Sequence, residues 1–352
     1  MKTVLHIVGN RPQFIKLVVL YKELAAAGIP QEIIHTGQHS SVEMSGIFFR
    51  ELQIPEPGVQ LHLSPGSAED FTGMATAALQ EQFSNKKDHI VLVYGDTNTT
   101  AAAARAAADS SLPLVHFEAG IRTGDDEMPE EKNRKLADSL AQVNYCCTKG
   151  NMSTMLAEGF GRAGGSRVVL TGDLMYDAFL RVGIEETFAA NEKDYICCTI
   201  HRAENIQSEK NLRAVVEALN AIHAEIPVLM PVHPHTRKKM IEFGLKPVFT
   251  QLQPLGYAAM KALLMGSSFV ITDSGGTARE AFFAHKRSVV VMAKPFWPEI
   301  SEAGCSIGTA AGNGILEALR QLPMLSANFQ TPIFGNGNAA AAIRNDLISW
   351  LR

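Results

Sequence analysis

The chain has 352 residues, of which 46% are hydrophobic and 19% charged, and its formal net charge is −4. This composition excludes an intrinsically disordered chain, and the length predicts two domains. The charge excludes a broad basic surface for nucleic acid, so an anionic ligand must be met by a few local cations. No apolar run reaches the ~18 residues of a membrane span, and the N-terminal residues lack the plan of a signal peptide. We therefore expect a cytoplasmic protein that binds neither nucleic acid nor membrane.

Strand-like runs of β-branched residues alternate with helix-like segments along the whole chain. In the first half, strands are expected over residues 3–8, 31–36, 89–93, 113–117 and 167–170, with helices over 14–27, 71–83 and 130–140. In the second half, strands are expected over residues 195–200, 227–230, 269–272 and 288–292, and an amphipathic helix over 339–351 closes the chain. Such alternation predicts an α/β fold with parallel sheets that are covered by helices on both faces.

Two such series of strands predict two Rossmann-like domains. We expect residues 1–171 to form the first domain, joined by a closing helix over 338–352, and residues 172–337 to form the second. In open α/β sheets, ligands bind beyond the carboxyl ends of the strands. With the two parallel sheets facing each other, an interdomain cleft is the expected binding site.

The five cysteines include two adjacent pairs, Cys146–Cys147 and Cys197–Cys198, both within strand-like runs. Neighbouring residues on a strand point to opposite faces, so neither pair is placed to form a disulfide or to hold a metal. We expect buried, reduced thiols, as is usual in an intracellular protein.

Cations and carboxylates follow the first-half strands. Arg11 lies in the turn after the first strand and Lys16 about one helical turn later, so both can reach an anion at that helix N-terminus. Asp96 directly follows a buried strand, where it is either a helix cap or a site residue. Glu118 follows the next strand, so it is expected at the same edge of the sheet.

A third carboxylate comes from the helix that begins at Pro129. Glu130 and Arg134 are spaced i, i+4 on that helix, which by itself indicates an exposed ion pair. Together with Asp96 and Glu118, however, Glu130 completes a group of three carboxylates with nearby cations. We interpret this convergence as a site.

In the second half, His201 follows a strand, and His233 and His235 follow the next one. No cysteine or carboxylate completes a metal-binding set with these two histidines, so we expect no metal. Ser274, Gly275 and Gly276 stand between a strand and a helix. Paired glycines at a helix start let backbone N–H groups approach a phosphate closely, and the serine hydroxyl adds a donor.

Two common nucleotide motifs do not account for this phosphate site. The chain contains no G-x-x-x-x-G-K-[ST] sequence, which excludes a P-loop nucleotidase. The segment 335–340 formally fits G-x-G-x-x-A, but no clear strand precedes it and no acidic ribose partner can follow about 20 residues later. We therefore expect no NAD and no other cofactor.

Taken together, these segments resemble the non-hydrolysing UDP-N-acetylglucosamine 2-epimerases, which have the GT-B fold. The resemblance covers nearly the whole chain, and the order of its motifs makes it specific. The motifs are VGNRPQFIK, HTGQH, VYGDTNTT, HFEAGIRTGDDEMPEEKNR, LTGDLMYD, TIHRAEN, PVHPHTRK, PLGY, ITDSGGTAREA and FGNGNAA.

The resemblance implies a reaction in two stages, in a homodimer. UDP leaves C1 as the C2 proton is removed, giving a 2-acetamidoglucal, and UDP then adds back while C2 is protonated from the other face. The roles that it implies are acid–base or sugar-positioning work for Asp96, Glu118, Glu130 and His201, and contacts to the phosphates or cleft for Arg11, Lys16, Arg134 and His233. It also implies diphosphate binding by Ser274, Gly275 and Gly276, ribose binding by Glu280, and uracil contacts by Leu255 and Met260.

One segment departs from the family. Family members carry an arginine in a loop ending E-R-P-E or E-W-x-E, whereas this chain has Ala293-Lys294-Pro295-Phe296-Trp297-Pro298-Glu299. The departure leaves the substrate open: it is UDP-GlcNAc or a decorated relative such as a 3-acetamido uronic acid form. A hydrolysing 2-epimerase, a GT-B glycosyltransferase and a non-catalytic UDP-sugar sensor are the other candidate functions.

Overall fold

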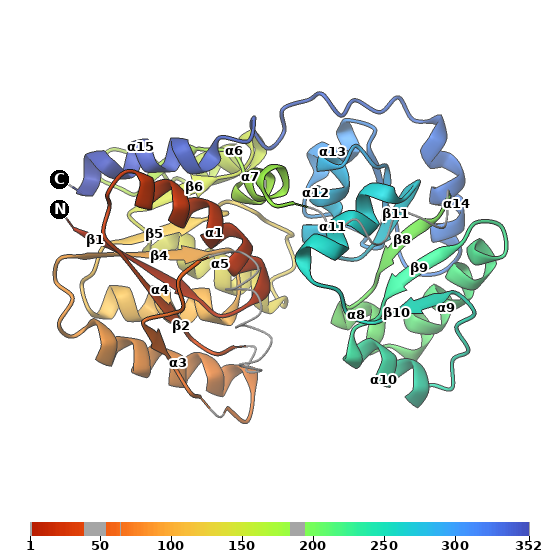
Figure 1. Ribbon diagram of the computed structural model, residues 1–352, viewed down its shortest axis with the longest axis horizontal. Coiled ribbons are helices and arrows are strands. Elements are labelled where there is room, and N and C mark those ends of the chain that lie inside the picture. The colour runs from red at the N-terminus through yellow and green to blue at the C-terminus, as the bar shows by residue number, and fades with distance from the viewer. Residues whose placement is uncertain (1, 39–53, 64, 184–193, 352) are drawn as a thin grey trace. The chain divides into compact units, whose positions relative to one another are not determined.

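The computed structural model describes residues 2–38, 54–63, 65–183 and 194–351, and the chain divides into two compact units (Figure 1). The first unit comprises Met1–Arg181 and Ile333–Arg352, and the second comprises Val182–Pro332. Among the described residues, no helix is both long enough and apolar enough to cross a membrane.

The first unit is built on a parallel sheet with the strand order β3-β2-β1-β4-β5-β6-β7. Its central strands are buried because they consist almost entirely of apolar residues. Strand order reverses between β1 and β4, the position at which doubly wound sheets bind ligands. The strands are β1 Thr3–Val8, β2 Gln31–His35, β3 Val59–Gln60, β4 His89–Tyr94, β5 Leu114–Phe117, β6 Val143–Cys146 and β7 Arg167–Leu170.

The helices of the first unit connect these strands. They are α1 Arg11–Ala26, α3 Ala68–Phe83, α4 Asn98–Asp109, α5 Pro129–Leu140, α6 Lys149–Ala157, α7 Leu174–Arg181 and the closing helix α15 Ala339–Leu351. Helix α15 packs against α1 and α7. Its first amides, those of Ala339 and Ala340, donate to the buried carboxylate of Asp177 in α7 at 3.0 and 2.9 Å. These hydrogen bonds tie α7 to α15, so α7 belongs to the first unit. The first segment of that unit therefore extends to Arg181, past the expected boundary at residue 171.

The second unit has a parallel sheet with the strand order β10-β9-β8-β11-β12-β13. Its strands are β8 Ile196–Thr199, β9 Val228–Pro231, β10 Thr250–Leu252, β11 Phe269–Thr272, β12 Ser288–Val290 and β13 Ser306–Gly308. Its helices are α8 Ala203–Ile206, α9 Glu209–His223, α10 Pro234–Glu242, α11 Tyr257–Gly266, α12 Gly275–Phe283, α13 Pro298–Glu302 and α14 Asn313–Gln321, with a 3₁₀ turn over Leu322–Met324.

The predicted α/β class with two parallel sheets is confirmed. The prediction omitted the strands β3, β10 and β13, which have only two or three residues each. Strand β6 was expected only as the strand-like run around Cys146–Cys147, because the polar side chain of Asn144 interrupts its apolar residues. That side chain is buried and donates to the carbonyl of Asp138 at 3.1 Å. Within the described part of the chain, all five cysteines are buried free thiols.

Candidate active site

The turn between β1 and α1 is packed tightly around two threonines. A Cβ on Gly9 would lie 2.1 Å from Thr99 Oγ1 and 2.3 Å from Thr36 Oγ1, so only glycine fits this position. Asn10 caps α1, and the buried side chain of Gln13 accepts from the Gly9 amide at 2.7 Å. The turn is therefore a rigid support for the first turn of α1, where half-buried Arg11 is located.

Lys16 and Glu118 form a buried ion pair at the carboxyl edge of the first sheet. Their side chains are only 6% and 10% exposed. Glu118 follows β5 with a φ of +71°, a left-handed conformation that costs a non-glycine residue about 1–2 kcal/mol. Strained backbone of this kind clusters at functional sites, because the surrounding structure must maintain it.

Asp96 lies in the neighbouring turn after β4 and forms an ion pair with Arg134 of α5. The Arg134 side chain is 1% exposed and that of Asp96 is 31% exposed, so a buried cation holds a partly accessible carboxylate. A Cβ on the preceding Gly95 would lie 3.3 Å from both Lys16 Nζ and Glu118 Oε2. The two ion pairs therefore lie on adjacent turns, as expected from their positions after adjacent strands.

The Arg134 ion pair differs from the exposed i, i+4 pair that the spacing alone indicated. Arg134 Nη1 contacts Glu131 Oε2 at 2.5 Å, and the Glu131 side chain is fully buried. Burial by itself raises the pKa of Glu131, but hydrogen bonds from Thr123 and the Arg134 guanidinium outweigh it and lower that pKa. Glu130, the predicted member of the site, is half-buried at the start of α5. Glu131 was not among the predicted site residues, although its i, i+3 spacing to Arg134 was an available signal.

In the second unit, the turn that carries His201 is organised by a buried aspartate. Asp273 follows β11, and its carboxylate accepts from the backbone amides of His201 and Arg202 at 3.0 and 2.9 Å. The His201 side chain is 48% exposed, with Nδ1 3.5 Å from Asp273 Oδ1. The imidazole is therefore accessible, while its backbone is held firmly.

The predicted phosphate cradle opens helix α12. Ser274 is the N-cap, and its hydroxyl oxygen accepts from the Thr277 amide at 3.3 Å. Gly275 and Gly276 form the first turn, where helix dipole and backbone amides favour an anion. A Cβ on Gly275 would come within 2.6 Å of the Phe296 ring, so this glycine is sterically required.

The unusual loop before α13 supports this cradle. The Trp297 indole N–H donates to the Gly275 carbonyl at 2.9 Å. The guanidinium of Arg279 lies over the Trp297 ring and that of Arg202 over the Phe296 ring, 5.0 and 5.1 Å from the centroids. Two arginines are thus held on aromatic rings beside the cradle, in a chain whose loop lacks the arginine expected from the resemblance.

The remaining predicted residues of the second unit lie at its strand ends and on α11 and α12. Glu280 is half-buried on α12, and its negative charge acts on Lys261, whose pKa is lowered because burial outweighs this attraction. Leu255 and Met260 are partly buried and pack against the hydrophobic core. His233 caps α10 and accepts from the His235 amide at 3.2 Å.

Comparison with known proteins identifies the family to which this arrangement belongs. The sequence profile described as UDP-N-acetylglucosamine 2-epimerase matches residues 22–347. The chain is 38% identical to UDP-2,3-diacetamido-2,3-dideoxy-D-glucuronate 2-epimerase of Pseudomonas aeruginosa, over 97% of this chain and 98% of that protein.

The chain belongs to the UDP-N-acetylglucosamine 2-epimerase family.

Two further relatives carry the family's name. The UDP-N-acetylglucosamine 2-epimerase of Methanococcus maripaludis is 32% identical, with 96% of each chain covered. The crystal structure of Methanocaldococcus jannaschii UDP-GlcNAc 2-epimerase in complex with UDP-GlcNAc and UDP superposes with a TM-score of 0.91, at 29% identity and with 99% of each chain covered. Membership of this epimerase family makes the protein an isomerase with a GT-B fold, as the resemblance implied.

Proposed function

We propose that this member of the 2-epimerase family interconverts UDP-GlcNAc and UDP-ManNAc without releasing free sugar. In the forward direction, a base removes the C2 proton, the C1–O bond breaks, and UDP leaves with its electron pair to give a 2-acetamidoglucal. In the return step, a UDP oxygen adds to C1 as C2 is protonated from the opposite face. No electrons are gained or lost overall, so the cycle requires no redox cofactor.

The observation that carries this proposal is the pair of carboxylates on adjacent turns of the first unit. Asp96 and Glu118 follow β4 and β5, and each is paired with a buried cation. An inversion at carbon needs proton-handling groups for two faces, and two carboxylates on neighbouring turns meet that need. Their order of action is left open, with Glu130 and His201 as the other proton-handling candidates.

We assign UDP binding to the second unit and stabilisation of the departing diphosphate to four cations. The amides of Gly275 and Gly276, with the Ser274 hydroxyl, would hold the diphosphate at the start of α12. Glu280 would bind ribose hydroxyls, and Leu255 and Met260 would contact the uracil. The negative charge that develops on the departing diphosphate would be stabilised by Arg11, Lys16, Arg134 and His233.

Proton NMR in deuterated water, without added metal or NAD, tests this proposal. Purified protein and UDP-GlcNAc should give a UDP-ManNAc anomeric signal, with deuterium at C2 of both sugars. Accumulation of UDP and free ManNAc would instead indicate a hydrolysing enzyme. Binding of UDP-GlcNAc with neither exchange nor a new anomeric signal would contradict the proposal and favour a sensor or another substrate.

A second substrate has a specific observation in its favour. Identity to the P. aeruginosa UDP-2,3-diacetamido-2,3-dideoxy-D-glucuronate 2-epimerase is 38%, against 32% for the M. maripaludis UDP-GlcNAc enzyme. The same NMR experiment should therefore be run with UDP-2,3-diacetamido-2,3-dideoxy-D-glucuronate. A kcat/KM at least tenfold higher for the uronate would make it the substrate and would leave the C2 chemistry unchanged.

We also propose a cytoplasmic homodimer, which the family resemblance supports. Light scattering during size-exclusion chromatography should give a mass near twice the 38.2 kDa of one chain. A mass of one chain at micromolar concentration would contradict this assembly.

A further inference from the structure

A fully buried histidine lies between the two carboxylate-bearing turns of the first unit. His116 occupies β5, where its Nε2 lies 2.7 Å from the Gly95 carbonyl oxygen and its Nδ1 lies 2.8 Å from Asp138 Oδ1. A carbonyl oxygen can only accept a hydrogen bond, so Nε2 carries a proton. Nε2 is therefore a donor that holds the Gly95 backbone.

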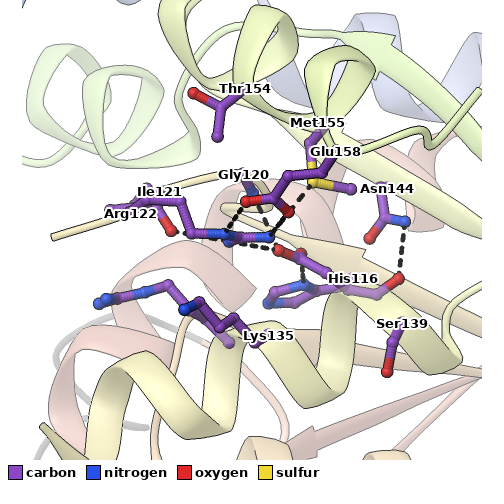
Figure 2. Close-up of polar contacts among 12 residues, drawn as sticks. His116, Gly120, Ile121, Arg122, Lys135, Ser139, Asn144, Thr154, Met155 and Glu158 are labelled. Atoms are coloured by element: carbon purple, nitrogen blue, oxygen red, sulfur yellow. Dashed lines mark hydrogen bonds and ion pairs between the residues drawn. The ribbon is translucent and has the colours of Figure 1, made fainter. Parts of the chain in front are cut away.

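Asp138 extends this contact to the second turn. Its other oxygen, Oδ2, accepts from the Gly120 amide at 3.3 Å and from Arg122 Nη1 at 2.7 Å. Figure 2 shows Arg122 reaching on to Glu158, whose Oε2 lies 2.7 Å from Arg122 Nη2. Arg122 thus links Asp138 to Glu158 through two ion pairs.

The network touches the backbone on either side of the proposed proton-handling residues. Gly95, held by His116, immediately precedes Asp96, and Gly120, held by Asp138, is two residues after Glu118. Both glycines have left-handed backbones, with φ of +67° and +81°. A Cβ on Gly120 would lie 2.4 Å from the Asn151 carbonyl, so this turn has little room to shift.

We propose that His116 and Asp138 are positioning residues that fix the Asp96 and Glu118 turns relative to each other for proton transfer at C2. This inference rests on the proposed function. The pair acts through the backbone and not as a proton relay, because both ring nitrogens already face protein acceptors. Displacement of a reacting group by about 1 Å can cost roughly 100-fold in rate, so loss of the pair should reduce kcat strongly.

Substitutions that remove or retain the hydrogen bonds test the proposal. His116→Phe and Asp138→Ala each break the connection, and kcat should fall at least tenfold, to an expected value about 100-fold below that of the native enzyme. Asp138→Asn can keep it: its oxygen accepts from Gly120 and Arg122, and its amide donates to Nδ1 of His116. This variant should stay within tenfold of native kcat.

Three readouts separate positioning from loss of structure. The Kd for UDP, measured by calorimetry, should stay within twofold in all three variants, because the proposed cradle belongs to the other unit. His6→Phe is the matched control: His6 is also fully buried and bonded, to Tyr94 and Gln31, and its substitution should spare kcat. Hydrogen exchange should accelerate at residues 94–97 and 118–121 in His116→Phe and remain native in the second unit.

Several results would overturn the proposal. They are a kcat within tenfold of native in His116→Phe or Asp138→Ala, an Asp138→Asn variant as impaired as Asp138→Ala, or equal losses in the His6→Phe control. If the native enzyme turns over neither nucleotide sugar, the proposed function fails. The exchange measurement then decides the positioning claim by itself, and unchanged exchange in His116→Phe refutes it.

Discussion

Neutralising one member of the Lys16–Glu118 pair should reveal how strongly the first unit depends on it. The two side chains are 6% and 10% exposed, so Lys16→Met leaves a carboxylate in a site largely closed to water. Removal of one partner from a buried ion pair costs about 3–5 kcal/mol, whereas exposed pairs contribute about 0–1 kcal/mol. We expect Lys16→Met and Glu118→Gln each to lower the free energy of unfolding of the first unit by about 3–5 kcal/mol.

The double variant Lys16→Met/Glu118→Gln separates pairing from simple loss of contacts. It leaves no unpaired charge, so its cost should be smaller than the sum of the two single costs by about 2–3 kcal/mol. Lys132→Met is the control, because Lys132 pairs with Glu127 in an exposed pair with side chains 61% and 94% accessible. Its effect should stay below about 1 kcal/mol.

Urea unfolding followed by fluorine NMR of 5-fluorotryptophan measures these effects unit by unit. The chain has two tryptophans, Trp297 in the second unit and Trp350 in α15 of the first, so each unit has its own signal. Only the Trp350 transition should shift in the Lys16 and Glu118 variants. Single-variant costs that add within about 0.5 kcal/mol, or a Lys16→Met cost below 1 kcal/mol, would refute the argument.

Three further predictions follow from individual contacts. Burial lowers the pKa of His6 to about 4 from an ordinary 6.5, so between these pH values the folded state binds fewer protons than the unfolded state. Stability that is present above pH 6.5 is therefore lost as the pH falls towards 4, by about 1.4 kcal/mol per pH unit. Urea unfolding followed at Trp350 should show this pH dependence in the native protein but not in His6→Phe. Gly9→Ala should destabilise the first unit by about 1–3 kcal/mol through its clash with Thr36 and Thr99. Gly73→Ala is the control, because Gly73 is an exposed residue of α3 whose added Cβ would meet nothing within 4 Å, and it should be neutral or stabilising. Equal urea midpoints for the two variants would contradict the close approach at Gly9. Trp297→Phe removes the indole hydrogen bond to the Gly275 carbonyl, which is worth about 0.5–1.5 kcal/mol. Calorimetry should therefore show UDP binding weakened about 2- to 10-fold. An unchanged Kd would show that this loop does not support the cradle.

The sequence by itself determined the alternation of strands and helices. It also predicted that the candidate site residues lie at the carboxyl ends of the strands. Apolar β-branched runs such as residues 89–93 are recognisable because a central parallel strand must be apolar on both faces. Asp96, Glu118 and the Ser274–Gly276 segment could be selected because a polar or glycine residue directly after such a strand lies at its carboxyl end. Only the end of β6, around Cys146–Cys147, was recognisable as strand-like, because the buried Asn144 interrupts the apolar run and donates to the carbonyl of Asp138 six residues away.

The tertiary structure decided which charges are paired and what holds them. Spacing on α5 offered Glu130 and Glu131 as neighbours of Arg134, and the choice of Glu131 depends on Thr123, whose segment folds back over that carboxylate. The partners of Lys16 and His116 are 102 and 22 residues away in sequence. Side-chain pairing across parallel strands and their crossover helices is set by three-dimensional packing, because local periodicity specifies only the face on which a residue lies.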